Sequence, residues 1–145
     1  MGNSSEVVLE NSVSVFMIKK FEDLTVYQKA FTLSLELYRI TKNFPDEEKF
    51  GLTNQIRRAA VSVVSNIAEG SMRLNSLEFR QFVGIARGSV GELRSQISIA
   101  QALGFVEVEK ADQLFVLLDE IGKMLTVLAR SLKAKAAASN TNTND

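Results

Sequence analysis

The chain has 145 residues, enough for one domain with a substantial core, and its 17 lysines and arginines balance its 17 aspartates and glutamates. Histidine and cysteine are both absent, which excludes disulfides, thiolate metal sites, histidine-based triads and the usual zinc ligands. A neutral chain also lacks the overall positive field that drives non-specific binding of nucleic acid. No apolar stretch is long enough to span a membrane and no signal peptide is recognisable, so we expect a cytoplasmic protein without membrane contact.

Apolar spacing and the single proline, Pro45, divide the chain into four long helical segments. We expect residues 1–20 to form a poorly ordered arm. Met17, just before the first helical pattern, is an alternative start site, so residues 1–16 carry little weight in this interpretation. The first helix is predicted over 24–42, with core positions at Leu24, Tyr27, Phe31, Leu35 and Tyr38. Further apolar residues widen the stripes of the first and fourth helices, and we expect some of this surface to meet another subunit. They are Leu33, Leu37 and Ile40, and Phe115, Leu117, Met124 and Val127.

The second helix is predicted to start within 46–50 and to run through Glu69. Gly70 follows directly, and we expect it to be the left-handed cap of this helix because glycine adopts a positive φ at little steric cost. The apolar residues repeat at helical spacing, and the core face is predicted to consist of Leu52, Ile56, Ala60, Val63 and Ile67.

A capping box of Asn75 and Glu78 predicts the start of the third helix, and Gly104 predicts its end. The fourth helix is predicted from the apolar repeat over 111–132. An alanine-, serine- and asparagine-rich tail over 136–145 is expected to be disordered. The core positions of these two helices are predicted to be Phe79, Val83, Ala86, Val90, Leu93, Ile97 and Ala100, and Ala111, Leu114, Leu118, Ile121, Leu125, Leu128 and Leu132.

Four long amphipathic helices with short links favour antiparallel neighbours, because a short loop cannot carry the chain back along the bundle. The sequence therefore predicts an all-α, antiparallel up-down-up-down four-helix bundle over residues 21–135. Its apolar stripes are wider than one core needs, so we expect the bundle to form a homo-oligomer.

The neutral total hides a basic region. Residues 49–94 contain seven basic and three acidic side chains, and three of the arginines recur every seven residues along the third helix. Three interpretations stay open: a solvated flank whose arginines pair with carboxylates, a subunit interface, and a surface that follows nucleic-acid phosphates. The candidate contact set is Arg57, Arg58, Arg73, Arg80, Arg87 and Arg94. Of the adjacent pair Arg57 and Arg58, we expect one side chain to be paired and the other to face outward.

Small residues recur in steps of four and three on the third helix: Gly84, Gly88, Gly91, Ser95 and Ser98. They share a face roughly opposite the core stripe. An interior glycine costs about 1 kcal/mol against alanine, which favours a surface that another backbone approaches closely over a merely solvated face.

No catalytic, metal or cofactor site is predicted. The glycines interrupt a helix and do not join a strand to a helix, so they form no phosphate loop. The carboxylates show no paired spacing typical of acid–base or metal chemistry; they include Glu36, Glu69, Glu78 and Glu92. Glu69 near a helix C-terminus is unfavourable unless an arginine pairs with it, and Asn66, one turn earlier, is predicted either to cross-link the next loop or to be an ordinary polar flank.

Four segments together resemble a known family: Phe21-Glu-Asp-Leu24, Gly51-Leu-Thr-Asn-Gln-Ile-Arg-Arg-Ala-Ala60, Ser65-Asn-Ile-Ala-Glu-Gly70 and Gly88-Ser-Val-Gly-Glu-Leu93. The chain resembles the four-helix bundle proteins encoded within 23S ribosomal RNA intervening sequences, from about Met17 to Lys133. The matching positions include Gln55, Arg57, Arg58, Asn66, Ala68, Glu69, Gly70, Ser89, Glu92 and Leu93.

The resemblance implies a bundle that assembles into a ring, typically a pentamer, in a bacterial cytoplasm. A related branch is the accessory protein of diversity-generating retroelements, a strongly basic ring that binds reverse transcriptase and nucleic acid. The present chain departs from that branch because it is neutral overall.

Two functional hypotheses follow. The first is a non-enzymatic homo-oligomeric binding module, associated with nucleic acid or ribonucleoprotein through the arginines. The second is a purely structural or protein-binding oligomer in which the same arginines lie at subunit contacts. An enzymatic alternative requires a metal or nucleotide bound by carboxylates and arginines. No motif in the sequence indicates such a site.

Overall fold

The computed structural model describes residues 20–142, so the predicted arm over 1–20 lies almost entirely outside the described residues. This part of the chain contains four α-helices and no strand, which confirms the all-α class. The helices are α2 (Thr25–Thr41), α3 (Leu52–Ser71), α4 (Ser76–Ala102) and α5 (Val108–Thr141). Two short 3-10 turns, η1 (Phe21–Asp23) and η2 (Asp46–Glu48), precede α2 and α3.

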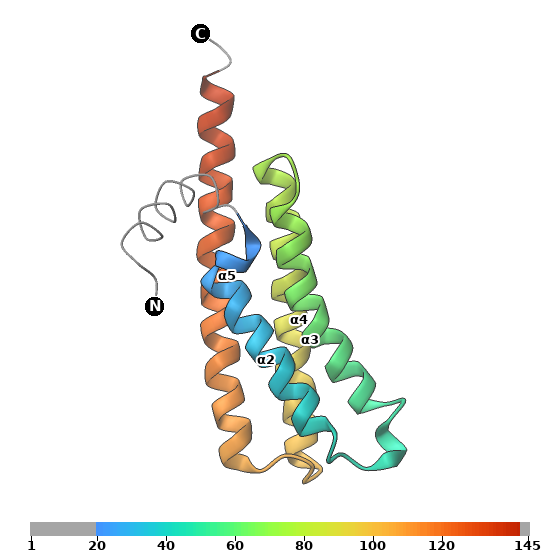
Figure 1. Ribbon diagram of the computed structural model, residues 1–145. Coiled ribbons are helices and arrows are strands. Elements are labelled where there is room, and N and C mark those ends of the chain that lie inside the picture. Colours follow the sequence, from blue (N-terminus) through green and yellow to red (C-terminus); the bar gives the residue numbers. More distant parts are fainter. Residues whose placement is uncertain (1–19, 143–145) are drawn as a thin grey trace, which may run out of the picture.

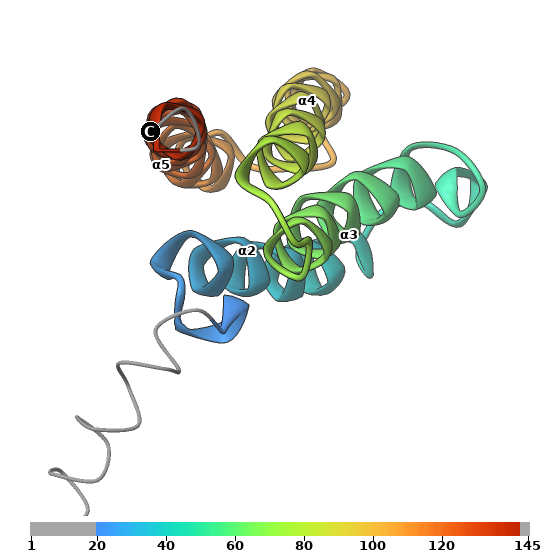
Figure 2. The same cartoon turned by 90° about the horizontal axis from the view of Figure 1, so that it is seen from above.

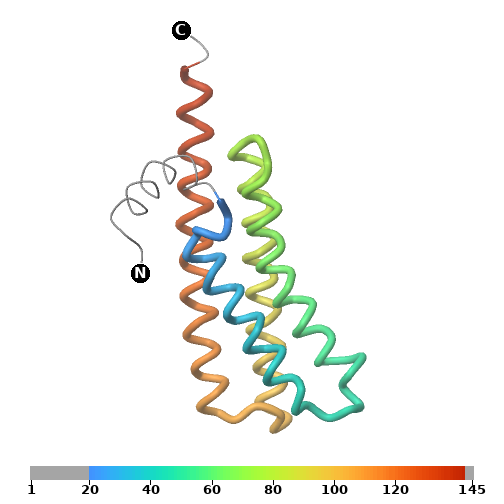
Figure 3. The backbone as a smooth tube through the Cα atoms, in the orientation of Figure 1, coloured from blue at the N-terminus to red at the C-terminus, as the bar shows by residue number. Residues whose placement is uncertain are grey.

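The helices lie side by side around one core, with α4 packed against both α3 and α5, and α2 packed against α3 and α5 (Figures 1 and 2). The backbone trace shows the α2–α3 and α4–α5 connections at one end of the molecule and the α3–α4 turn at the other (Figure 3). No described helix is long and apolar enough to cross a membrane.

The core is built from aliphatic side chains of all four helices. The predicted core faces of α3, α4 and α5 are confirmed: every residue named there is buried or partly buried against the core. The largest fully buried side chains on α4 and α5 are Leu93, Ile97, Leu118, Ile121 and Leu125.

The core face predicted for the first helix is confirmed at Leu24 and Tyr27, which pack against the core, and is wrong at its other three positions. Phe31, Leu35 and Tyr38 are 46%, 45% and 40% exposed, whereas Leu33 and Leu37 are 1% exposed. The helix carries two apolar stripes, and the buried one also contains Ala30, whose small side chain lets α2 approach its neighbours closely. The aromatic stripe is therefore left on the outer face of α2.

The limits of α3 differ from the prediction at both ends. The helix begins at Leu52, after η2, and the Glu48 carboxylate accepts a hydrogen bond of 3.0 Å from the Leu52 amide. Gly70 is not a left-handed cap: it is buried within the helix, which continues to Ser71, and its φ is not positive. A Cβ at Gly70 would lie 2.7 Å from the Cβ of Phe82, so Gly70 is needed where α3 meets α4.

Both predicted limits of α4 are confirmed. The Asn75 side chain accepts a 2.9 Å hydrogen bond from the Glu78 amide, which is half of the expected capping box. At the other end Gly104 has a φ of +80°. The Phe105 amide donates to the Ala100 carbonyl and the Gly104 amide to the Gln101 carbonyl, at 2.8 and 2.9 Å, which is the Schellman pattern.

Helix α5 is longer than the sequence indicated. It continues to Thr141, so the disorder predicted from residue 136 is wrong over 136–141. No glycine or proline interrupts this part, and its alanines favour helix. In Figure 1 the last turns of α5 rise beyond the other helices.

Candidate functional site

The six candidate arginines do not form one surface. Arg57 is turned toward α2, where its Nε donates to the Thr41 hydroxyl at 2.9 Å and its guanidinium lies 4.7 Å from the Tyr38 ring centre. Arg58 is exposed and lines a groove between α3 and α4. The expected division of this pair, one side chain bonded and one facing outward, is confirmed.

Arg73 lies at the α3–α4 turn, where its contacts are with α3 and the start of α4. It forms an ion pair of 3.1 Å with Glu69, and its guanidinium lies 4.7 Å from the Phe82 ring centre. The arginine partner that the sequence required for Glu69 is therefore present, within one helical turn. These contacts give Arg73 a structural role at the turn.

Arg80, Arg87 and Arg94 lie on the side of α4 that faces α5. Arg80 Nε donates to the Ala129 carbonyl at 3.3 Å, and Arg94 is hydrogen-bonded to Asp119. Arg87 lines a groove between the two helices with a volume of about 700 Å³, and two cations of α5 line the same groove, Lys123 and Arg130. We call these five basic residues the α4/α5 seam: Arg80, Arg87, Arg94, Lys123 and Arg130.

The α4/α5 seam carries an excess of positive charge. Asp119 is the acidic residue that lines its groove, and it is already paired with Arg94, which also lies 5.2 Å from the Phe115 ring centre. Among the described residues, Arg87, Lys123 and Arg130 have no ion-pair partner. Five cations against one carboxylate make a basic strip in a neutral protein.

The two basic residues of α5 were not among the residues predicted from the sequence. Lys123 and Arg130 are seven residues apart, the same interval that singled out Arg80, Arg87 and Arg94. The matching seven-residue intervals on two consecutive helices were the feature of the sequence that could have identified them. The Arg80–Ala129 and Arg94–Asp119 contacts set the two rows opposite each other.

A polar groove lies on the other side of α4, against α3. It has a volume of about 530 Å³, and we call it the α3/α4 groove, lined by Phe50, Asn54, Gln55, Arg58, Ala59, Ser62, Ser89, Glu92 and Gln96. The Ser62 and Ser89 hydroxyls are 2.7 Å apart, and the Asn66 amide donates to the Ser62 hydroxyl at 3.0 Å. Asn66 thus supports the groove wall and does not cross-link the next loop.

Several polar groups of the α3/α4 groove lack partners. Gln96 Oε1 is buried without a hydrogen bond. Asn54, Gln55, Arg58 and Glu92 form no hydrogen bond or ion pair with other described residues, although they line the groove from two helices. Arg58 and Glu92 were singled out from the sequence, but Gln96 and Phe50 were not. A lone glutamine or phenylalanine indicates no binding site until the helices are packed together.

The small residues of α4 form an exposed ridge between the two grooves. Gly91 lines the α4/α5 groove, while Ser89 and Glu92 line the α3/α4 groove. A Cβ added at Gly84, Gly88 or Gly91 would meet nothing within 4 Å. We call this ridge the glycine ridge, consisting of Gly84, Gly88, Gly91 and Ser95. Ser98 bonds back to the Arg94 carbonyl at 2.8 Å.

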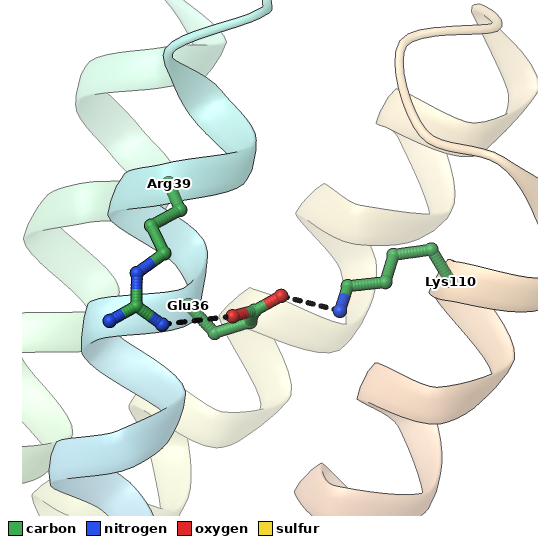
Figure 4. A network of polar contacts seen from close by, with 3 residues as sticks. All are labelled: Glu36, Arg39 and Lys110. Atoms are coloured by element: carbon green, nitrogen blue, oxygen red, sulfur yellow. Dashed lines mark hydrogen bonds and ion pairs between the residues drawn. The ribbon is translucent and has the colours of Figure 1, made fainter.

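The ion-pair network at Glu36 links α2 to α5 (Figure 4). Glu36 is paired with Lys110, and Arg39 lies 3.4 Å away on the other carboxylate oxygen. The hydrogen bond from Lys110 is the main cause that lowers the pKa of Glu36, with a smaller effect of Arg39; partial burial opposes them. Its contacts give the network a structural role. Across the described residues, no three acidic side chains gather in a way that could hold a metal ion.

The fold and its motifs define an all-α bundle protein, and comparison with known proteins identifies its family. Residues 22–127 match the family model for 23S rRNA-intervening sequence proteins. The chain therefore belongs to this family, which confirms the resemblance seen in its motifs. No curated protein matches the chain significantly.

A solved structure supports the fold. The chain is similar to a protein of unknown function from the S23 ribosomal protein family of Bacteroides thetaiotaomicron, with a TM-score of 0.68 and 19% sequence identity. The similarity covers 72% of this chain and 98% of the other.

Proposed function

We propose that this chain is a non-catalytic, cytoplasmic, homo-oligomeric binding module that binds single-stranded nucleic acid by its phosphates along the α4/α5 seam. The observation that carries the proposal is the alignment of Arg80, Arg87 and Arg94 on α4 with Lys123 and Arg130 on α5, against the single carboxylate of Asp119. Clustered cations without counter-charges attract a polyanion, and binding releases its condensed counterions.

The length of the seam suits an extended strand. Successive arginines are seven residues apart, so Arg80 and Arg94 are separated by about 21 Å along the helix axis at 1.5 Å per residue. That distance spans several nucleotides. The pair Arg87 and Arg130 is especially suited to phosphate, because a guanidinium with no internal partner keeps its full set of donors.

Assembly would strengthen such binding. Phe31, Leu35 and Tyr38 form an exposed stripe on the outer face of α2, and a second copy covering it would bury that apolar surface. In the ring of antiparallel up-down-up-down bundles that the family resemblance implies, the seam is repeated in every copy. Several weak sites on one strand then act together through a high effective concentration.

Charge reversal tests the proposal. We expect the full chain to bind a labelled single-stranded RNA at low salt, with an affinity that falls steeply as salt rises. Arg87→Glu should weaken binding by about tenfold or more and flatten the salt dependence, and the double variant Arg80→Glu, Arg87→Glu should abolish it. Lys42→Glu is the matched control, because Lys42 is exposed, unpaired and at the C-terminal end of α2.

Fluorescence anisotropy over a range of salt concentrations measures the binding, and light scattering confirms that each variant keeps its mass. Equal losses in Arg87→Glu and Lys42→Glu would contradict a specific role of the seam. So would RNA binding that does not depend on salt, or the absence of RNA binding at low salt.

A further inference from the structure

We propose that the α3/α4 groove binds one unstacked nucleobase, preferably guanine, of a strand whose phosphates occupy the α4/α5 seam. This inference rests on the proposed function and extends it from holding phosphates to recognising a base. The groove volume of about 530 Å³ is within the range of small-ligand sites, and the groove is lined mainly by polar side chains.

The unpaired polar groups of the groove suit a ligand with its own donors and acceptors. The buried Gln96 Oε1 lacks a donor, and a buried polar atom without a partner is unfavourable. Arg58 on α3 offers donors, and Glu92 on α4 offers acceptors, with no partner for either among the described residues. Simple phosphate would satisfy Arg58 alone and would be repelled by Glu92.

Guanine matches this arrangement. Its O6 and N7 are adjacent acceptors that an arginine binds with two hydrogen bonds, and its N2 amine is a donor. Arg58 thus meets the acceptor edge, and Glu92 accepts from N1–H and the N2 amine. The second hydrogen of the amine is then free for Gln96 Oε1. Adenine has an amine in place of O6 and no hydrogen on N1, and uracil has neither N7 nor an exocyclic amine.

Phe50 supplies a stacking surface at the groove. Its side chain is 86% exposed, whereas large aromatic side chains are usually at least partly buried. Unpaired bases stack on exposed aromatic rings, and each such contact contributes substantially to affinity. Lys49, 5.7 Å from the ring centre, adds a cation beside the stacked base.

The glycine ridge allows one strand to reach both sites. The seam and the groove flank α4, and the exposed face between them carries Gly84, Gly88, Gly91 and Ser95. Because no side chain rises from the three glycines, a sugar–phosphate backbone can cross the helix in close contact with it. This use also explains why helix-weakening glycines occupy an exposed face.

Two labelled octamers test the inference with the full chain: one RNA of alternating guanosine and uridine, and one abasic ribose–phosphate chain of equal length. We expect the wild type to bind the guanosine-containing octamer about tenfold more tightly or better. Phe50→Ala should bring the two affinities close to one another, while the affinity for the abasic chain stays unchanged. Glu92→Gln should also bring the two affinities together, without a loss of affinity for the abasic chain, because the variant removes a carboxylate that repels phosphate. Arg87→Glu should weaken both complexes by the same factor.

Neutral guanosine separates this inference from the proposed function. In NMR titrations, guanosine should shift the Gln55 and Gln96 side-chain amide signals, and adenosine should not. Equal wild-type affinities for the two octamers would overturn base recognition while leaving phosphate binding intact. If guanosine shifts these NMR signals but RNA binding does not depend on salt, the proposed phosphate binding at the α4/α5 seam would be overturned instead. A lower solution mass for Glu92→Gln would identify the groove as a subunit contact and overturn the inference.

Discussion

Gly70 on α3 and Phe82 on α4 fix how closely the two helices approach. A methyl group at Gly70 would lie 2.7 Å from the Phe82 Cβ, a separation that folded proteins do not tolerate. The same glycine also faces Phe79, whose ring carbon would lie 2.9 Å away. This contact holds the end of α3 against α4, just below the turn that Arg73 and Glu69 stabilise.

Gly70→Ala should therefore destabilise the fold by about 1–3 kcal/mol, because the helices must move apart to accommodate the methyl group. Gly84→Ala is the matched control: a Cβ there meets nothing, and alanine should raise stability by up to about 1 kcal/mol through helix propensity. Urea unfolding monitored by circular dichroism measures both. Similar stabilities for the two variants would show that the close approach at Gly70 is not required.

The two neighbouring arginines of α3 should behave differently. Arg57→Ala removes the hydrogen bond to Thr41 and the ring contact with Tyr38, so the free energy of unfolding should fall by about 1–2 kcal/mol. Arg58→Ala removes no such contact and should leave stability within about 0.5 kcal/mol of the wild type. RNA affinity should show the reverse order, with the larger loss in Arg58→Ala. Equal unfolding free energies would contradict the structural role of Arg57.

Acid should weaken the link between α2 and α5. The folded state lowers the pKa of Glu36 from its ordinary value of 4.5, so ionised Glu36 stabilises the fold above that pH. This contribution is lost as the pH falls through the lowered pKa. Glu36→Gln should be less stable than the wild type at pH 7, and the difference should shrink as the pH falls below 4.5 and through the lowered pKa. Glu47→Gln, on the exposed η2 turn, is the control. A difference that does not change with pH would contradict the prediction.

Gly88→Leu distinguishes the two functional hypotheses. If the glycine ridge accommodates nucleic acid, the leucine side chain should reduce RNA affinity while the solution mass stays the same. If the ridge instead admits a helix of another subunit, as in the purely structural alternative, the same change should split the assembly. Light scattering and anisotropy on one sample separate these outcomes. If neither the mass nor the RNA affinity changes, the glycine ridge takes part neither in RNA binding nor in subunit assembly.

Much of the fold follows from local patterns. The apolar repeats located all four helices, and Asn75 and Gly104 set the limits of α4 because caps depend on nearby backbone groups. The choice of buried face on α2 could not be predicted, since Leu33 and Phe31 belong to two stripes of similar apolarity. Only the partner helices decide between them, and they favour the stripe with Ala30.

The candidate site was predicted less well for a related reason. The sequence identified three arginines together because they recur every seven residues on one helix, α4: Arg80, Arg87 and Arg94. Their neighbour Arg130 lies on another helix, and the partners of Arg57 depend on how α2 crosses α3. Contacts between residues of different helices depend on how the helices pack, and the repeat pattern of one helix does not reveal them.

Solution mass with and without RNA tests the central claim most directly. Light scattering at low and high salt should show an oligomer, near the five copies that the family resemblance implies. We expect it to gain the mass of RNA at low salt and to lose it at high salt. An oligomer that ignores RNA at every salt concentration would contradict the account and would assign the seam arginines to a structural role.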